Sequence, residues 1–381
     1  MLFKRYLDLP RLLEKKSHFL FGPRSTGKTF LIRSQFPKGT AILDLLESEL
    51  YLRLSTNPGD LESIIFAFDN PLIAIIDEVQ RVPQLLNEVH RLIEKKGIKF
   101  LLTGSSARKL RHNQANLLAG RARQSELFPL TYSEIPKFNL DRYLHFGGLP
   151  MVYQSDEPTD DLHTYVDTYL KEEIQAEALV RQLPAFTRFL KHSALTSGEM
   201  LNFANISNDA AVPASTVREY YSILEDTFIG FMLPAYTKTI KRKPISTAKF
   251  YYFDIGVKNT LSGITSIPNQ SDLYGKAFEH FIALELRAYL SYKRKHLPLT
   301  YWQSKNGQEV DFIIGDDIAI EVKTTNRTQD KHLKGLKTLE EEKLFKRYIL
   351  ISHDALKRRS GNLEIMHWQE FLTELWSDAI A

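Results

Sequence analysis

The sequence has no cysteine among its 381 residues. This excludes disulfides, thiolate metal sites and cysteine nucleophiles, and it fits a reducing, cytoplasmic location. No stretch approaches the roughly 20 consecutive apolar residues that a membrane-spanning helix needs. Residues 1–5, Met-Leu-Phe-Lys-Arg, are not followed by the apolar core and cleavage site of a secretory signal. We therefore expect a protein that is neither exported nor embedded in a membrane.

An excess of one charge is also missing. The 50 Lys and Arg residues nearly balance the 46 Asp and Glu residues, which leaves a formal net charge of +4. This average does not by itself indicate nucleic acid as a partner. With 43% hydrophobic and 25% charged residues the composition is that of a folded globular protein. The length predicts about two or three domains.

A loop at residues 22–29 is the strongest signal. It reads Gly-Pro-Arg-Ser-Thr-Gly-Lys-Thr and matches the phosphate-binding pattern G-x-x-x-x-G-K-[ST] at every fixed position. An apolar run precedes it and a helix-forming run follows, which is the strand, loop and helix order that the pattern requires. We expect the loop to surround the phosphates of ATP with backbone N–H groups. The predicted nucleotide-binding residues are Gly22, Pro23, Arg24, Ser25, Thr26, Gly27, Lys28 and Thr29.

A second motif completes a predicted magnesium site. The apolar run at 71–76 ends in Asp77 and Glu78, which is typical of a Walker B strand. Thr29 and Asp77 would hold Mg²⁺, and Lys28 would reach the β and γ phosphates. Glu78 would polarise the attacking water. The pattern therefore predicts ATP hydrolysis as well as ATP binding.

A third strand is expected at 98–103, and it leads into Gly-Ser-Ser. A polar residue at the end of a strand beside the nucleotide strand can contact the γ-phosphate or the lytic water. Thr103 is the predicted sensor, with Ser105 as the alternative. A plain strand-to-helix turn capped by serine explains the same residues equally well.

An arginine finger is predicted after this strand. Residues 118–123 contain Arg121 and Arg123, and an arginine near the phosphates stabilises negative charge in the transition state. Arg121 is the first candidate, acting within the chain or on a neighbouring subunit. The sequence leaves both the geometry and the oligomeric state open.

Together these motifs resemble one known family. The loop at 22–29, the run Ile-Asp-Glu-Val-Gln-Arg-Val-Pro at 76–83, the sequence Leu-Thr-Gly-Ser-Ser at 102–106, Gly120 with Arg121, and Pro-Leu-Thr at 129–131 with Glu134 are similar to bacterial and archaeal AAA-type ATPases that carry a C-terminal DUF4143 region. The resemblance covers nearly the entire chain. It implies an ATPase core, a winged-helix segment and a restriction-endonuclease-like domain.

The middle of the chain reads as helical. Residues 160–179 form one helical stretch, and three further helices are predicted at 185–197, 200–208 and 214–226. An extended pair at 230–235 and 249–253 encloses the basic stretch 238–243. This order is typical of a winged helix that places one helix in the DNA major groove and a basic wing on the phosphates. A protein-contact module with a solvated basic loop is the alternative.

The C-terminal part carries a second chemical pattern. Asp311 lies in a strand at 309–314, and Glu321 and Lys323 lie in the next strand, which matches the PD-(D/E)xK nuclease motif except that Val310 replaces the proline. The period of a strand puts Glu321 and Lys323 on one face, and a hairpin would place Asp311 beside them. Asp311 and Glu321, with Glu279 from a helix, would bind Mg²⁺, and Lys323 would orient or deprotonate the attacking water.

These patterns predict an α/β protein with three parts. Residues 1–150 would form a P-loop AAA-type ATPase domain, 151–260 a helical lid and winged helix, and 261–381 a nuclease-like domain. The predicted function is ATP binding and hydrolysis linked to nucleic acid, chiefly DNA, with Mg²⁺-dependent phosphodiester cleavage at the C-terminal site. The alternatives are a nucleotide-switched binding module with an inactive nuclease fold, and a protein that binds ATP but scarcely hydrolyses it.

Overall fold

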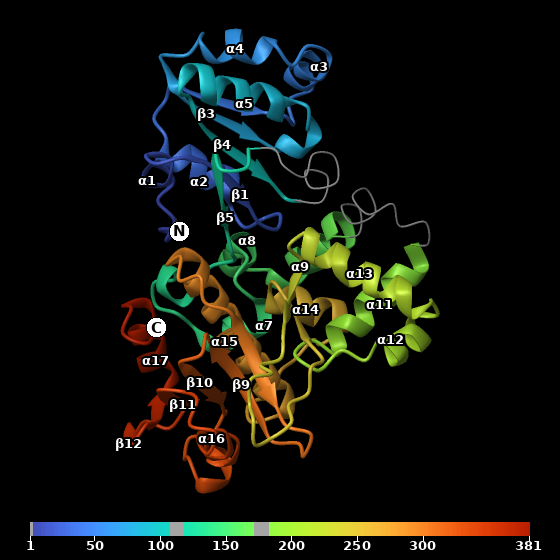
Figure 1. The fold of residues 1–381 in the computed structure, drawn as a ribbon. Helices are drawn as coiled ribbons and strands as arrows, with labels where there is room; N and C mark the ends of the chain where they lie inside the picture. Colours follow the sequence, from blue (N-terminus) through green and yellow to red (C-terminus); the bar gives the residue numbers. More distant parts are fainter. Residues whose placement is uncertain (1–2, 107–117, 171–182) are drawn as a thin grey trace.

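The computed structural model describes residues 3–106, 118–170 and 183–381 (Figure 1). Its sheets have five, two and six strands, in that order along the chain. In the part of the chain that the structure describes, no helix has the length and apolar character needed to cross a bilayer.

The amino-terminal sheet is entirely parallel. It consists of β1 (Ser17–Phe21), β2 (Thr40–Asp44), β3 (Asn70–Asp77), β4 (Lys99–Gly104) and β5 (Ala122–Glu126), in the order β2-β3-β4-β1-β5. Side chains of β1 alternate between two apolar clusters, because Leu20 packs in one and Phe19 and Phe21 pack in the other. The sheet is therefore covered on both faces, as in other parallel sheets.

The helices of this part carry the apolar side chains that cover the sheet. They are α1 (Leu9–Leu13), α2 (Lys28–Gln35), α3 (Ser48–Thr56), α4 (Asp60–Ile65) and α5 (Leu85–Lys96), with short 3₁₀ turns at Val79–Arg81 and Tyr132–Glu134. In α5, Leu85, Val89 and Leu92 recur at helical spacing and are fully buried. Helix α2 begins at Lys28, directly after the glycine-rich loop.

The strand predicted directly before the phosphate loop and those predicted at 71–76 and 98–103 are confirmed as β1, β3 and β4. Strands β2 and β5 were not predicted. Strand β5 reads Ala-Arg-Gln-Ser-Glu and lies at the edge of the sheet, where its side chains are partly exposed. An edge strand with few apolar residues has no hydrophobic period, so its sequence does not reveal it.

The middle of the chain is mostly helical. It contains α7 (Leu140–Phe146), α8 (Pro150–Gln154), α9 (Pro158–Thr164), a π-helix at Tyr165–Leu170, α11 (Leu183–Leu195), α12 (Phe203–Ala210), α13 (Ala214–Asp226), the antiparallel strands β6 (Gly230–Leu233) and β7 (Lys249–Tyr252), and α14 (Ile255–Ser262). The three helices and the strand pair follow the predicted order. Residues 171–179 of the predicted stretch 160–179 lie outside the described residues.

The C-terminal sheet is mixed. Its elements are α15 (Asp272–Tyr292), β8 (Leu299–Gln303), β9 (Glu309–Ile314), β10 (Ile318–Val322), a 3₁₀ turn at Asp330–Leu333, α16 (Lys334–Glu340), β11 (Arg347–Ser352), β12 (Arg358–Ser360), β13 (Leu363–His367) and α17 (Trp368–Trp376). The strand order is β12-β13-β11-β10-β9-β8, and β9 and β10 form the antiparallel hairpin that the sequence predicts.

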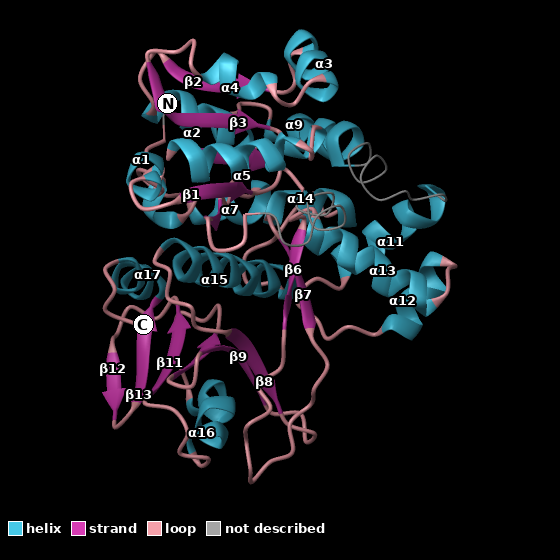
Figure 2. Ribbon diagram, turned by 45° about the horizontal axis from the view of Figure 1, so that its top comes forward, coloured by secondary structure: helices cyan, strands magenta, loops and turns pink. Residues whose placement is uncertain are grey.

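Helix α15 joins the first and third parts. Figure 2 shows it between the amino-terminal layer and the C-terminal sheet. Arg287 of α15 lies 2.9 Å from Glu126 of β5. Glu285 accepts hydrogen bonds from the backbone N–H of Tyr132 at 2.7 Å and from the indole of Trp376 at 2.8 Å. Burial raises the pKa of Glu285 to about 8. The helix is thus fixed to both parts by buried polar contacts.

Candidate nucleotide and metal sites

The loop at 22–29 connects β1 to α2 and has the backbone of a phosphate cradle. The backbone φ angles of Gly22 and Gly27 are +148° and +92°. Residues that carry a Cβ rarely adopt such angles. A Cβ on Gly22 would lie 2.4 Å from the carbonyl oxygen of Leu127. Position 22 therefore requires glycine for two reasons, which are its backbone φ angle and the close approach of the Leu127 carbonyl.

Lys28 is folded back over this loop. Its Nζ donates hydrogen bonds to the carbonyl oxygens of Gly22 at 2.7 Å and Pro23 at 2.9 Å. The side chain is buried. The ammonium group is thus already held inside the loop, where the predicted phosphates would bind.

The predicted magnesium ligands meet at the carboxyl edge of the sheet. The hydroxyl of Thr29 donates a hydrogen bond of 2.7 Å to Asp77 Oδ2, and Thr103 donates a short one to Asp77 Oδ1. Strands β3 and β4 pair in parallel register, with Ile76 opposite Leu102, so Asp77 and Thr103 lie near the carboxyl ends of neighbouring strands. Oxygen donors of this kind suit Mg²⁺.

Glu78 lies next to these ligands in an unusual conformation. Its φ is +60°, in the left-handed region, which is rare for a residue other than glycine and recurs at functional sites. The amide of Gln80 donates a short hydrogen bond to Glu78 Oε2 and also lies 3.4 Å from the hydroxyl of Ser105. The sequence did not reveal Gln80 as a partner of the predicted base, although it lies within the quoted 76–83 motif.

Arg5 also contacts the loop. Its guanidinium donates hydrogen bonds of 2.6 Å to the carbonyl oxygens of Thr26 and Phe128 and pairs with Glu134 at 3.0 Å. Both charged side chains are almost completely buried. Burial lowers the pKa of Arg5 but Glu134 raises it, and the net effect is an increase, so the guanidinium stays charged. No sequence motif identified this contact.

Arg121 is not near the phosphate loop. It precedes β5, and the register of β1 and β5 pairs Ser17 with Ala122 at the amino ends of both strands. The loop follows the carboxyl end of β1, so Arg121 lies at the opposite edge of the sheet, where it pairs with Glu94. The prediction of a finger within the chain is therefore wrong for this structure, and a role on a neighbouring subunit stays a prediction.

An apolar pocket of about 200 Å³ opens beside the loop. It is lined by Phe3, Arg5, Gly27, Phe30, Leu130, Pro150, Met151 and Gln154. Phe30 and Met151 are 52% and 55% exposed, which is unusual for large apolar side chains. These residues come from the start of the chain, from the phosphate loop and α2, from the segment after β5 and from α8, so sequence spacing gave no sign of the pocket.

The C-terminal motif residues converge as the hairpin predicts. Lys323 Nζ lies 2.6 Å from Glu321 Oε1 and 4.0 Å from Asp311 Oδ2, and Asp311 accepts a hydrogen bond from the backbone of Val322. Burial, together with nearby Asp311, raises the pKa of Glu321 well above its usual range. Burial lowers the pKa of Lys323, but Asp311 and Glu321 raise it more.

Glu279 does not complete this group as a third metal ligand. Its Oε1 accepts a hydrogen bond from Tyr251 at 2.6 Å and lies 3.5 Å from Lys249 Nζ. In the three described ranges, no three acidic or histidine side chains are placed to hold a metal ion together. The predicted three-ligand set is therefore not assembled, because a lysine holds Glu279 instead.

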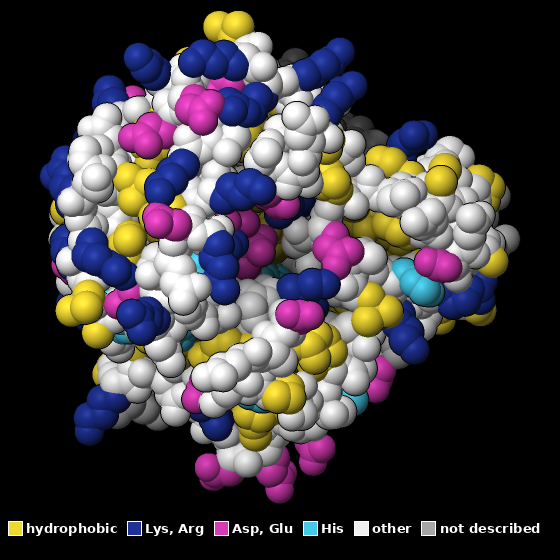
Figure 3. Space-filling view, turned by 90° about the horizontal axis from the view of Figure 1, so that it is seen from below, with side chains coloured by type: hydrophobic (Ala, Val, Ile, Leu, Met, Phe, Trp, Pro, Cys, Tyr) yellow, Lys and Arg dark blue, Asp and Glu magenta, His cyan; other side chains and the backbone are white. Residues whose placement is uncertain are grey.

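The basic stretch 238–243 is also engaged within the chain. Lys238 pairs with Asp316 at 2.7 Å and Arg242 pairs with Glu341 at 2.6 Å. Glu342 accepts hydrogen bonds from three consecutive backbone N–H groups, at 240–242. Much of the positive charge expected on a DNA-binding wing is thus neutralised by the C-terminal domain. Figure 3 shows a face on which basic and acidic side chains are interspersed.

Three family models match consecutive parts of the chain. An AAA domain matches residues 14–136, a domain of unknown function named DUF8612 matches 137–267, and DUF4143, also of unknown function, matches 274–371. The AAA match and the parallel sheet with its phosphate loop agree on a P-loop NTPase domain at the amino terminus.

Two curated proteins of unknown function are similar in sequence. One, from Haemophilus influenzae, is 26% identical over 60% of this chain and 59% of its own length. The other, from Methanocaldococcus jannaschii, is 23% identical over 94% of this chain and 85% of its own length. The chain thus matches somewhat less than two thirds of the Haemophilus protein.

Two solved structures are distantly similar. A Walker-type ATPase of Pyrococcus abyssi is 16% identical, with a TM-score of 0.44, over 67% of this chain and 93% of that one. A structure of Drosophila ORC bound to AT-rich DNA and Cdc6 is 10% identical, with a TM-score of 0.24, over 68% of this chain and 89% of that one.

Proposed function

For a chain that carries an AAA domain and a DUF4143 domain, we propose that the amino-terminal domain binds ATP with Mg²⁺ and hydrolyses it. The observation that carries this proposal is the hydrogen bond between Thr29 and Asp77 directly behind the phosphate loop. Two oxygen donors at this place are what Mg²⁺ bound to a nucleotide requires from the protein. Bound there, Mg²⁺ supplies positive charge against the phosphate oxygens.

The loop supplies the remaining phosphate contacts. Lys28 exchanges its bonds to the carbonyls of Gly22 and Pro23 for bonds to the β and γ phosphates, which are stronger acceptors. The amino end of α2 begins at the same residue and adds its backbone N–H groups and dipole. Arg5 holds the backbone of Thr26 in place by a hydrogen bond to its carbonyl oxygen.

Glu78 accepts the proton of the attacking water. Its left-handed backbone turns the carboxylate away from the direction that a continued strand would give it. Gln80 holds one oxygen of that carboxylate, which leaves the other for water. Thr103 binds Asp77 and the backbone N–H of Glu78, so it fixes both acidic residues relative to each other.

The base of the nucleotide occupies the apolar pocket beside Gly27 and Phe30. A planar base is recognised mainly by apolar contacts with a few polar groups that fix its orientation. Gln154 offers one such group. Exposed Met151 and Phe30 would become covered, which explains why large apolar side chains lie at this surface.

Titration calorimetry of ATP and of inorganic tripolyphosphate, both in the presence of Mg²⁺, tests the phosphate site and the base pocket. Lys28→Ala is expected to weaken both ligands by roughly 10-fold or more, since it removes charge-assisted hydrogen bonds. Met151→Glu is expected to weaken ATP but leave tripolyphosphate unchanged, because only ATP has a base. Leu52→Glu, at an equally exposed apolar residue of α3, is the matched control.

The phosphate site and the base pocket can be refuted independently of each other. A wild-type protein that binds neither ligand would refute nucleotide binding altogether. A Met151→Glu protein with unchanged affinity for ATP would refute the base pocket and leave the phosphate site standing.

A second candidate function is Mg²⁺-dependent cleavage of a nucleic-acid phosphodiester at the C-terminal site. The observation that favours it is Glu321 Oε2, a buried carboxylate oxygen for which the described residues supply no hydrogen-bond partner. Such an atom is costly to bury unless a cation or donor meets it. Asp311 and Glu321 would hold Mg²⁺, which supplies Lewis-acid charge, and Lys323 would orient the attacking water.

Cleavage of labelled single-stranded and duplex DNA tests this candidate. Lys323→Ala is expected to lower the Mg²⁺-dependent rate by about 10²- to 10⁴-fold, as loss of an acid–base group does, while ATP turnover is retained. Wild-type protein that cuts neither substrate would count against cleavage. ATP-dependent DNA binding that survives Asp311→Ala would then favour the binding module with an inactive nuclease fold.

A further inference from the structure

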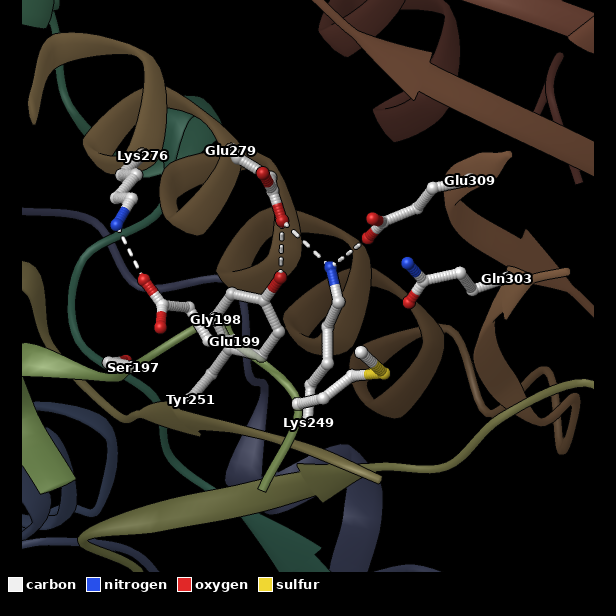
Figure 4. A pocket seen from close by; sticks show the side chains of 10 residues that line it. Ser197, Gly198, Glu199, Lys249, Tyr251, Lys276, Glu279, Gln303 and Glu309 are labelled. Atoms are coloured by element: carbon white, nitrogen blue, oxygen red, sulfur yellow. Dashed lines mark hydrogen bonds and ion pairs between the residues drawn. The ribbon is translucent and has the colours of Figure 1, made fainter. Parts of the chain in front are cut away.

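Lys249 lies inside the acidic cluster of the C-terminal domain, which consists of Glu279, Glu309, Asp311 and Glu321. Its Nζ is 2.5 Å from Glu309 Oε1 and 3.5 Å from Glu279 Oε1, and its side chain is only 6% exposed. Figure 4 shows the ammonium group between these two carboxylates. A single positive charge therefore bridges the two acids at one end of the cluster.

This lysine comes from outside the C-terminal domain. It begins β7, in the segment matched by the DUF8612 model, whereas Glu279 belongs to α15 and Glu309 to β9. The neighbouring Tyr251 donates its hydroxyl to Glu279, and Lys249 also lies 5.0 Å from the ring centre of Tyr301. The middle segment thus supplies the cation for acids of another domain.

The cluster has more acidic than basic side chains. Among the residues that the structure describes, its four carboxylates have only Lys249 and Lys323 at ion-pairing distance. Glu321 is 6% exposed, and its Oε2 has no hydrogen-bond partner within the described part of the chain. A buried acid of this kind is neutralised by a proton, as the raised pKa of Glu321 indicates, unless a cation compensates its charge, and an unpartnered oxygen is an open ligand position.

We propose that Lys249 is a built-in cation that competes with a divalent metal for the acidic cluster. While its ammonium binds Glu279 and Glu309, the cluster offers only Asp311 and Glu321 to a metal. When Lys249 leaves, Glu279 becomes available as the third ligand, and a divalent cation binds. Binding of this kind requires neither ATP hydrolysis nor strand cleavage.

The end of the cluster that holds Glu279 and Glu309 opens to a pocket. A pocket of about 290 Å³ is lined by Lys249, Tyr251, Glu279, Gln303 and Glu309. At its rim Lys276 pairs with Glu199 at 2.5 Å, and both side chains are half exposed. Lys276 lines the same pocket, and the ion pair described for it is with Glu199 rather than with the acids that Lys249 binds, which makes it a control for Lys249.

Mn²⁺ binding measured by electron paramagnetic resonance tests the proposal. The measurement is made without nucleotide and in an Asp77→Asn background, which removes the amino-terminal metal ligand. Lys249→Met keeps the length of the side chain and removes its charge, and it is expected to tighten Mn²⁺ binding by roughly 10- to 100-fold. Lys276→Met should leave Mn²⁺ affinity unchanged, and adding Asp311→Asn to Lys249→Met should abolish the gain.

A measurement on the same background with Lys249 intact covers the case in which Lys249→Met does not fold. Reductive methylation followed by mass spectrometry should label Lys249 poorly without metal and more strongly in excess Mn²⁺, with no change at Lys276. Unchanged Mn²⁺ affinity in folded Lys249→Met protein would overturn the proposal. Labelling of Lys249 that Mn²⁺ does not increase would overturn it as well.

Discussion

Glu78→Gln is expected to lower the rate of ATP hydrolysis by roughly 10²- to 10⁴-fold while ATP affinity stays within a few-fold of the wild type. The amide cannot accept the proton of the attacking water, but it keeps the shape of the side chain. Phosphate release under single-turnover conditions measures the rate, and calorimetry measures the affinity.

The control is Glu49→Gln, which changes an exposed acid in the first turn of α3. It should leave the rate unchanged. A Glu78→Gln protein that hydrolyses ATP at the wild-type rate would show that another group activates the water, or that hydrolysis does not take place at this site.

Glu134→Ala is expected to destabilise the amino-terminal domain by about 3–5 kcal/mol, because it leaves the buried charge of Arg5 without its partner. It also removes the acceptor of the backbone N–H groups of Tyr6 and Thr131. Urea unfolding followed by circular dichroism measures the change. The transition of this domain is identified as the one that ATP shifts to higher urea.

The double variant Arg5→Met with Glu134→Leu separates the charge from the packing. Removal of both charges is expected to recover part of the lost stability, but not all of it, because the carbonyls of Thr26 and Phe128 lose their donor. If Glu134→Ala alone changed the unfolding free energy by less than about 1 kcal/mol, the buried ion pair would have no such role.

Local pattern was enough to predict the phosphate site. Lys28 and Thr29 are fixed by the loop in which they lie, and Asp77 by the strand that it ends. A parallel sheet brings the carboxyl ends of its strands to one edge, so Thr29, Asp77 and Thr103 meet without any long-range information. The hairpin of β9 and β10 made Asp311, Glu321 and Lys323 predictable in the same way.

Long-range contacts could not be predicted from the sequence. Lys249 precedes Glu279 by 30 residues and Glu309 by 60, and nothing in its surroundings marks it as a partner of a buried acid. The expectation that Arg121 lies near the phosphate loop of its own chain was wrong. The sequence around Arg121 does not determine at which edge of the sheet this residue lies. That edge is set by the parallel pairing of β5 with β1.

The partners of the basic stretch 238–243 were also not predictable from the sequence. Its charge was visible in the sequence, but its partners Asp316, Glu341 and Glu342 lie about 75 to 100 residues later, on the C-terminal domain. A run of like charges predicts an electrostatic partner but does not say whether that partner is a nucleic acid or the same chain.

The most direct test of the central claim is phosphate release from ATP by the purified wild-type chain, with Mg²⁺ and with the metal removed by chelation. We predict multiple turnovers that require Mg²⁺ and are lost in Lys28→Ala. Turnover that persists in Lys28→Ala, or a wild-type chain that neither binds nor hydrolyses ATP, would contradict the assignment of the loop at 22–29 as a catalytic phosphate site.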